Sequence, residues 1–129
     1  MVIAGAAHAE EVGVMCNVAP GFRIDEIKDP HTIITATGVE PGAPRNFVIT
    51  STGLETPWGG ACAKATITPD HVDVVCQIDD NSGAYPFQTK IIVGINRRLG
   101  SYTETEVLTD QHGERRTIYK GTCQKREGF

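Results

Sequence analysis

The chain has 129 residues and a formal charge of −4, from 12 Lys and Arg residues against 16 Asp and Glu residues. This length suits one domain with a single hydrophobic core, and the acidic balance disfavours non-specific binding to nucleic acid, which requires a basic surface. No stretch approaches the ~20 consecutive apolar residues that span a bilayer, so we expect no membrane insertion.

The first nine residues look like the end of a secretory signal peptide. Ala7, His8 and Ala9 fit the small-x-small pattern of a cleavage site, and the acidic Glu10 follows directly. The alternative is a native flexible tail. We therefore divide the chain into a signal-peptide remnant or disordered tail, residues 1–9, and a single domain, residues 10–129. A periplasmic or secreted protein is expected.

Beyond this segment, apolar and polar residues alternate with the period of two that is typical of half-buried strands. The clearest examples are the runs from His71 to Asp79 and from Phe87 to Ile95. The other expected strands are rich in Val, Ile, Thr and Tyr, which favour a pleated surface. In chain order they are Glu11–Val18, Phe22–Lys28, Thr32–Thr37, Asn46–Thr50, Ala61–Thr68, Tyr102–Leu108 and Arg116–Cys123, with a short helix as the alternative for Phe22–Lys28.

Turn-forming residues separate these segments. Residues 29–30, 68–71, 79–83, 97–100 and 110–113 each match a turn between strands. Strands at intervals of about ten residues with short turns favour an antiparallel meander. The expected fold is all-β, with about eight strands in a small closed barrel; a two-sheet β-sandwich is the alternative.

The four cysteines allow three disulfide pairings in an oxidising compartment. Cys62 and Cys76 flank a turn between strands that we expect to pair, although a two-residue loop at Pro69-Asp70 would require a bulge to bring them opposite each other. Cys16 lies in the first strand and Cys123 in the last, and these strands are neighbours in a closed meander. The predicted disulfides are Cys16–Cys123 and Cys62–Cys76.

Motifs for catalysis or cofactor binding are not evident. The chain has no Gly-x-Ser-x-Gly elbow, phosphate loop or HExxH motif, so we expect no enzyme, no catalytic residues, no cofactor and no bound metal. Glu104 and Glu106 share one strand face and could bind a cation or act as an acid/base pair, although a solvated outer face is the simpler interpretation. His31, His71 and His112 stand in three separate turns, where we expect them to be solvated.

The function that we expect is that of a non-catalytic binding protein. A barrel of about eight strands is wide enough to hold one small apolar ligand, as in calycin-like carriers. Such a carrier requires an internal cavity of at least about 300 Å³. The ligand-binding residues would be the inward-facing side chains of the two clearest strands: Val72, Val74, Ile78, Phe87, Ile91, Val93 and Ile95.

The alternative is a protein-binding module, such as an inhibitor of an envelope or host enzyme. Its partner-binding residues would be Leu54 and Trp58, in the loop formed by residues 53–60, because a rigid aromatic residue on an exposed loop is a typical contact residue. Trp58 could equally fold back and plug the end of the barrel. The expected partner is thus a small apolar molecule or an extracytoplasmic protein.

Overall fold

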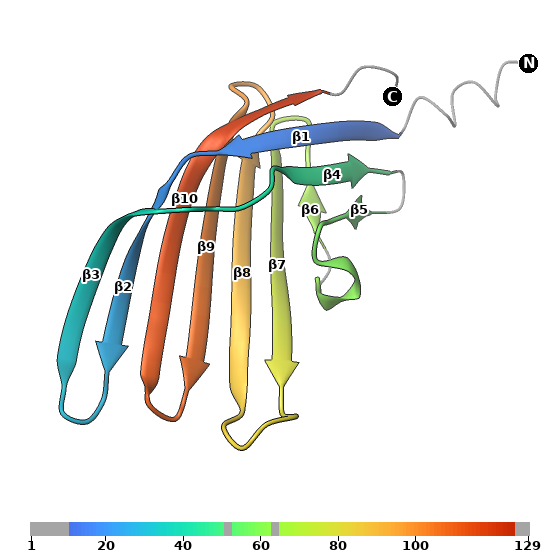
Figure 1. Ribbon diagram of the computed structural model, residues 1–129. Helices are drawn as coiled ribbons and strands as arrows, with labels where there is room; N and C mark the ends of the chain where they lie inside the picture. Colours follow the sequence, from blue (N-terminus) through green and yellow to red (C-terminus); the bar gives the residue numbers. More distant parts are fainter. Residues whose placement is uncertain (1–10, 51–52, 63–64, 126–129) are drawn as a thin grey trace, which may run out of the picture.

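The computed structural model describes residues 11–50, 53–62 and 65–125. The predicted signal remnant, residues 1–9, lies outside this part of the chain. The described residues form ten strands and one short 3-10 helix (Figure 1). They are β1 (Val12–Val18), β2 (Gly21–Ile27), β3 (Thr32–Val39), β4 (Arg45–Ile49), β5 (Leu54–Glu55), η1 (Gly59–Ala61), β6 (Thr66–Ile67), β7 (His71–Asp80), β8 (Phe87–Asn96), β9 (Ser101–Asp110) and β10 (Gly113–Lys125).

All ten strands belong to one antiparallel sheet that curls over at its upper end (Figure 1). The strand order is β5-β4-β1-β10-β9-β8-β7-β6, while β2 pairs with β10 and carries β3 on its other side. The long strand β10 pairs with β9 on one side and has two successive partners on the other. On that second side, residues 113–118 pair with β2, and residues 121–125 pair with β1. Gly121 stands where the partner changes, and a Cβ atom there would collide with the carbonyl oxygen of Asn17.

The predicted all-β antiparallel fold is confirmed, and the curled sheet is a half-barrel (Figure 1). β5 and β6 stand at the two ends of the strand order, and each has only two residues. No strand pairing joins them in the described part of the chain. The sheet curls but leaves the expected barrel open, because such short terminal strands offer little backbone for a closing ladder.

The predicted strand Phe22–Lys28 is confirmed: most of this segment forms β2, not the alternative short helix. A predicted segment further along the chain differs in detail. Of the predicted strand Ala61–Thr68, the described residues form strand only at β6; Ala61 is the last residue of η1, and Cys62 makes an isolated bridge to Cys76. Gly59 begins η1 with a positive φ of 60°, a conformation that is incompatible with a regular strand.

The hydrophobic core occupies the upper end, where β1 runs across the upper ends of the long strands and β4 lies beside it (Figure 1). The rings of Phe47 on β4 and Tyr102 on β9 illustrate the packing, with centroids 6.0 Å apart. The two layers bury a contiguous cluster: Val14, Cys16, Phe47, Ile49, Val72, Val74, Cys76, Ile91, Val93, Ile95 and Tyr102.

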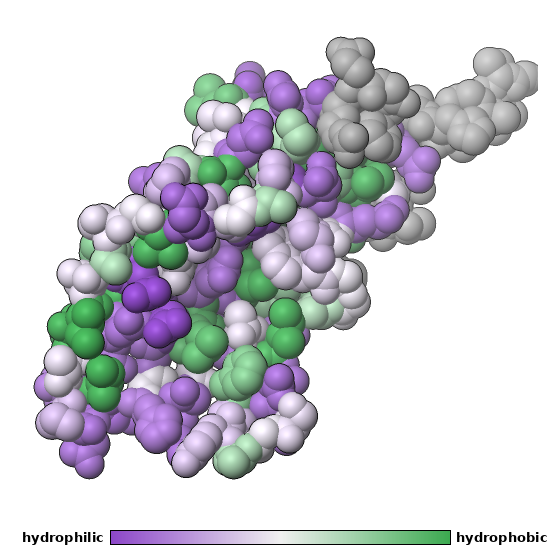
Figure 2. Space-filling model, viewed as in Figure 1, coloured by the Kyte–Doolittle hydropathy of each residue, from purple (hydrophilic) through white to green (hydrophobic). Residues whose placement is uncertain are grey.

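Below this core the sheet is a single layer (Figure 1). We call the side that bears the core residues the concave face and the opposite side the convex face. In the single layer, apolar side chains stay exposed on both faces: Ile34, Ile78 and Phe87 on the concave face and Ile33 on the convex face. Ile92 is also exposed on the convex face, behind the core residues Ile91 and Val93. Figure 2, viewed from the same side, shows apolar patches among polar side chains in this lower half.

Both predicted disulfides are present, Cys16–Cys123 and Cys62–Cys76. Cys16 faces Cys123 across the β1–β10 ladder, which confirms that the first and last strands are neighbours. Thr68 and His71 close the two-residue loop, and Thr66 faces Asp73. Cys62 faces Cys76, four positions from Thr66 on one side and three positions from Asp73 on the other. The register therefore shifts by one residue between the two pairs, as the short loop requires.

Two disulfides indicate an oxidising, extracytoplasmic environment. No helix among the described residues is long and apolar enough to cross a membrane.

Candidate functional site

The seven predicted ligand-binding side chains all lie on the concave face. Cross-strand pairing between β7 and β8 sets Val72 opposite Ile95 and Val74 opposite Val93, and opposed residues point to the same face. Position along the strand then divides the set. Val72, Val74, Ile91, Val93 and Ile95 are buried in the core, whereas Ile78 and Phe87 lie exposed in the single layer.

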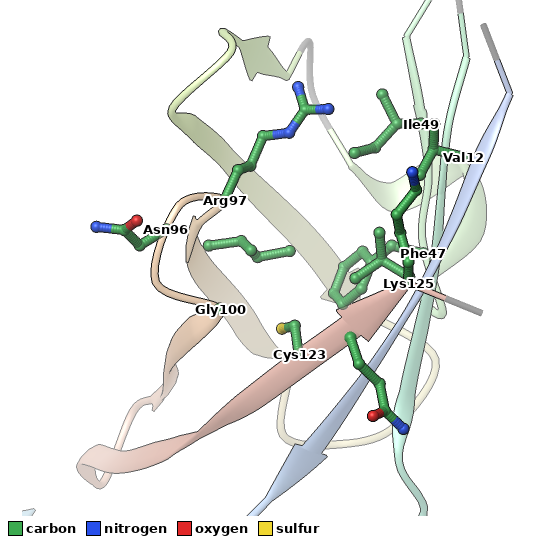
Figure 3. Close-up of a pocket in the computed structure, with 11 residues that line it drawn as sticks. Val12, Phe47, Ile49, Asn96, Arg97, Gly100, Cys123 and Lys125 are labelled. Carbon is green, nitrogen blue, oxygen red and sulfur yellow. The ribbon is translucent and has the colours of Figure 1, made fainter. Parts of the chain in front are cut away.

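An apolar pocket lies at the upper end of the half-barrel (Figure 3). Its volume is about 190 Å³, which is below the cavity of about 300 Å³ that we expected for a carrier. Most of the predicted ligand-binding side chains fill the interior of the sheet, and only Ile95 lines this pocket. The other lining residues are Val12, Val14, Phe47, Ile49, Asn96, Arg97, Gly100, Cys123, Gln124 and Lys125.

The apolar walls of the pocket come from strands far apart in the sequence. On β1, Val12 and Val14 face Ile49 and Phe47 of β4, and Ile95 belongs to β8. The disulfide from Cys123 ties β10 to β1 beside this wall. Sequence reasoning missed the β1 and β4 side chains, because only the pairing of these two strands brings them together.

Two cations line the same pocket. The Arg97 guanidinium and the Lys125 ammonium both lie toward the upper side of the pocket in Figure 3, while the Asn96 amide points away from it. Arg97 Nη1 donates to the Thr68 carbonyl oxygen at 2.8 Å, which orients the guanidinium. No carboxylate of the described residues forms an ion pair with either cation, whereas the neighbouring Arg98 pairs with Asp70 at 3.6 Å.

Leu54 and Trp58, the predicted partner-binding residues, pack against the core and are half-buried. Leu54 on β5 faces Ile49. The Trp58 ring meets Phe47 edge-on, with centroids 6.0 Å apart, and its backbone N–H donates to Thr56 Oγ1 at 3.2 Å. This placement favours the interpretation of Trp58 as a plug over the end of the sheet; partner binding by these residues stays a prediction.

The carboxylate pair occupies the interior, not the solvated outer face that we favoured. Glu104 is fully buried. Arg45 reaches across from β4 and binds it with two hydrogen bonds, Nε to Oε1 at 2.8 Å and Nη2 to Oε2 at 3.1 Å. The Tyr102 hydroxyl donates to Oε1 at 2.5 Å. Glu104 faces inward because it lies opposite Val93 on β8, and this bidentate pair clamps the two layers together.

Glu106 lies two residues further along β9 and opposite Ile91, at the lower border of the core. Burial, a hydrogen bond to Glu104 and the negative charge of Glu104 raise the pKa of Glu106 to about 8. Arg45 favours the ionised form only weakly, since Nη2 lies 3.8 Å from Oε2. Although burial opposes it, the Arg45 hydrogen bond lowers the pKa of Glu104 below its ordinary value. The pair therefore holds a shared proton at neutral pH.

A second hollow, an open groove of about 460 Å³, lies at the lower end among β2, β3, β9 and β10. Its lining is mixed: Ile27, Ile34 and Leu108 lie beside an ion pair between Arg115 Nε and Asp25 Oδ1 at 2.8 Å. This groove is more open to solvent than the upper pocket, and charged side chains form much of its lining.

The three predicted surface histidines occupy separate places. His31 pairs with Glu26, with Nε2 and Oε2 3.0 Å apart, His112 packs against the ring of Tyr85, and His71 begins β7. No group of three or more His, Cys, Asp or Glu side chains in the described ranges could hold a metal ion.

Comparisons of this chain with models of protein families, with curated proteins and with solved structures each found no match.

Proposed function

We propose that this protein is a periplasmic or secreted, non-catalytic carrier that binds a small apolar ligand with an anionic group in the pocket at the upper end of the half-barrel. The observation that carries the proposal is the pocket itself: apolar side chains of β1, β4 and β8 line it, and beside it stand two cations that form no ion pair with a carboxylate of the described residues.

The volume limits the ligand to a small molecule. Drug-sized ligands occupy pockets of about 300–1,000 Å³, which exceeds the 190 Å³ present. An apolar cavity of about 150 Å³ is large enough for one benzene ring. The ligand class is therefore a single ring or a short acyl chain, and the carrier is narrower than the barrel-type carrier expected from strand number.

The two cations supply the polar half of the recognition. Arg97 and Lys125 are exposed, so each keeps its charged group in water while its stem lies along the apolar wall. A carboxylate at the pocket mouth can pair with either cation at no cost to an existing ion pair, because neither has one within the described residues. Arg97 suits a carboxylate best, since its guanidinium presents two parallel donors.

Benzoate and hexanoate are suitable probes, with benzyl alcohol and hexanol as neutral analogues of the same shape. We expect both acids to shift backbone amide resonances of Val14, Phe47 and Ile95, and to bind about tenfold more tightly than the alcohols. The variant Arg97→Gln/Lys125→Gln should remove this preference. Arg98→Gln is the matched control, because Arg98 pairs with Asp70 and does not line the pocket.

Equal affinities for the acids and the alcohols would contradict the proposal that the ligand carries an anionic group. No perturbation of the pocket by any of the four probes would overturn the carrier itself. Native mass spectrometry of protein purified from its own host addresses the same point with the natural ligand, because a retained small molecule adds a defined mass.

A second candidate is an exported protein-binding module, such as an inhibitor of an envelope or host enzyme. The specific observation that favours it is the exposure of Ile34, Ile78 and Phe87 on the open concave face, since exposed apolar patches often mark interaction sites. Ile78→Ser, compared with Trp58→Ala, separates the two possible contact surfaces in a binding assay with extracytoplasmic proteins of the host. Equal recovery of every partner by both variants and the wild type would exclude both surfaces.

A further inference from the structure

The edges of the sheet are not protected equally. An unpaired edge strand exposes a row of backbone N–H and C=O groups that can pair with another chain, and soluble proteins usually guard such edges with charges, Pro or very short strands. The described sheet has free edges at β3, β5, β6 and the lower part of β7. Their sequences can therefore be compared directly.

Three of these edges have a feature that prevents pairing with another chain. β5 and β6 have two residues each, which is too short for a stable intermolecular ladder. β7 continues below the bridge from Cys62 to Cys76 and ends in the acidic pair Asp79 and Asp80. Two copies of this acidic edge would repel each other.

Strand β3 has none of these protective features. Its sequence, Thr32-Ile-Ile-Thr-Ala-Thr-Gly-Val39, has eight residues with neither charge nor proline, and it pairs only with β2 among the described strands. It is rich in Thr, Ile and Val, which favour strand pairing. Ile33 is 58% exposed and Ile34 is 49% exposed, and as adjacent residues they point to opposite faces of the sheet. Both faces of this edge thus present apolar surface to solvent.

We propose that β3 is the interface between two copies of this chain, which pair β3 with β3 in antiparallel orientation and continue the sheet across a two-fold axis. The pairing adds main-chain hydrogen bonds along the open edge. It also brings Ile33 and Ile34 of each copy against the uncharged side chains of the partner strand, so that apolar surface is buried on both faces at once.

Pairing of β3 with the same strand of a second copy is favoured over pairing with a different edge, which would give an open-ended polymer. Pairing of β3 with the lower edge of β7 would be head-to-tail and would propagate into a fibre unless the rotation closed. It would also set an uncharged strand against Asp79 and Asp80, whose charges discourage pairing. Pairing of β3 with itself has no charge conflict and stops at two copies. The upper pocket does not include β3, so the dimer interface and ligand binding can be tested independently.

The test is the mass of the intact chain in solution, measured by sedimentation equilibrium over a wide range of concentration. We expect a reversible dimer. Thr35→Lys, an exposed change in the middle of β3, should raise the dimer dissociation constant at least about tenfold. Thr109→Lys is the matched control: it places the same charge at an exposed threonine of the same face, on the interior strand β9, and should leave the constant unchanged.

Single cysteines placed in turn at positions 33 to 37 report on the pairing itself. A two-fold antiparallel ladder sets one residue directly opposite its own copy, so disulfide crosslinking under mild oxidation should peak at one position and fall on both sides. A monomer at every concentration, a dimer that Thr35→Lys leaves intact, an open-ended polymer, or crosslinking without a maximum would each overturn the proposal.

Discussion

The pairing of two carboxylates with a single arginine is the most distinctive chemistry of this protein at the residue scale. Arg45 neutralises Glu104 with two hydrogen bonds, and its remaining nitrogen, Nη1, donates to the carbonyl oxygens of Pro41 and Ala43 at 2.9 and 2.6 Å. Four of the five guanidinium N–H groups are therefore used, and Glu106 has only the longer contact to Nη2 at 3.8 Å. A half-buried carboxylate beside the negative charge of Glu104 retains its proton at neutral pH.

This arrangement predicts the pH dependence of stability. The folded-state pKa of Glu106 is raised to about 8 from an ordinary 4.5. Between these values the unfolded chain releases the proton while the folded chain keeps it, so stability falls as pH rises from about 4.5 to 8. The lowered pKa of Glu104 acts in a separate window, since its stabilisation is lost only as pH falls below the ordinary carboxyl range.

Glu106→Gln should abolish the decline between pH 5 and pH 8. Because the Glu106 side chain is 33% exposed, screening by solvent reduces the effect, and we expect the variant to gain about 2 kcal/mol over the wild type across this range. Urea denaturation at several pH values measures it. Glu114→Gln is the control, because Glu114 lies on the convex face of β10. A parallel decline in Glu106→Gln and the wild type would show that another group titrates in this window.

At the scale of elements, strand β10 organises the sheet. It pairs with β9 along one side and with β2 and then β1 along the other. The sheet can curl because β1 and β2 are separate strands that meet β10 at different points along its length. Cys123 then fastens the end of β10 to β1 across 107 residues of sequence.

The two disulfides should therefore differ in what they contribute to stability. In the chain-entropy account, closure of the long loop stabilises the fold by about 4–5 kcal/mol and closure of the 14-residue separation by about 3 kcal/mol. We expect Cys62→Ala/Cys76→Ala to be more stable than Cys16→Ala/Cys123→Ala by about 1–2 kcal/mol. Denaturant midpoints of the two double variants, with reduced wild type as a second reference, measure the difference. The reverse order would mean that the bulged β6–β7 register depends on its disulfide.

At the scale of the whole molecule, the protein consists of a two-layered upper half and a single-layered lower half (Figure 1). The upper half contains the hydrophobic core, the Arg45–Glu104 ion pair and both disulfides. Among the described residues, no second layer covers the sheet in the lower half, and apolar side chains such as Ile78 and Phe87 stay exposed there. Since local stability follows buried apolar contact, the two halves should open with different free energies.

Hydrogen exchange of strand β8 measures this difference within one element. β8 is flanked by β7 and β9 over nearly its whole length, so its amides share the same ladders. We expect amides near Val93 and Ile95 to be protected at least about tenfold more strongly than those near Gln88 and Thr89. Uniform protection along β8 at a concentration where the chain is monomeric would show that the lower half is as stable as the core.

The sequence alone determined the class of fold, most strand positions and both disulfides. These features follow from local signals: alternation along His71–Asp79, turn residues such as Pro69-Asp70, and cysteines in the first and last strands. The need for a bulge between Cys62 and Cys76 was also a local inference, because loop length sets register. The same alternation correctly placed Val72 and Val93 on one face.

Only the tertiary structure decided which part of the concave face is buried in the core and which part is exposed to solvent. Alternation assigns a side chain to a face but not to a depth, so it could not separate the buried Ile91 from the exposed Ile78. On β9 both faces carry polar residues, and the pattern could not show that Glu104 points inward. That placement is acceptable only because Arg45 arrives from a strand 59 residues away in the sequence. The end pocket depends in the same way on β1 pairing with β4. Long-range pairing is set by how the whole sheet curls, and no local pattern encodes it.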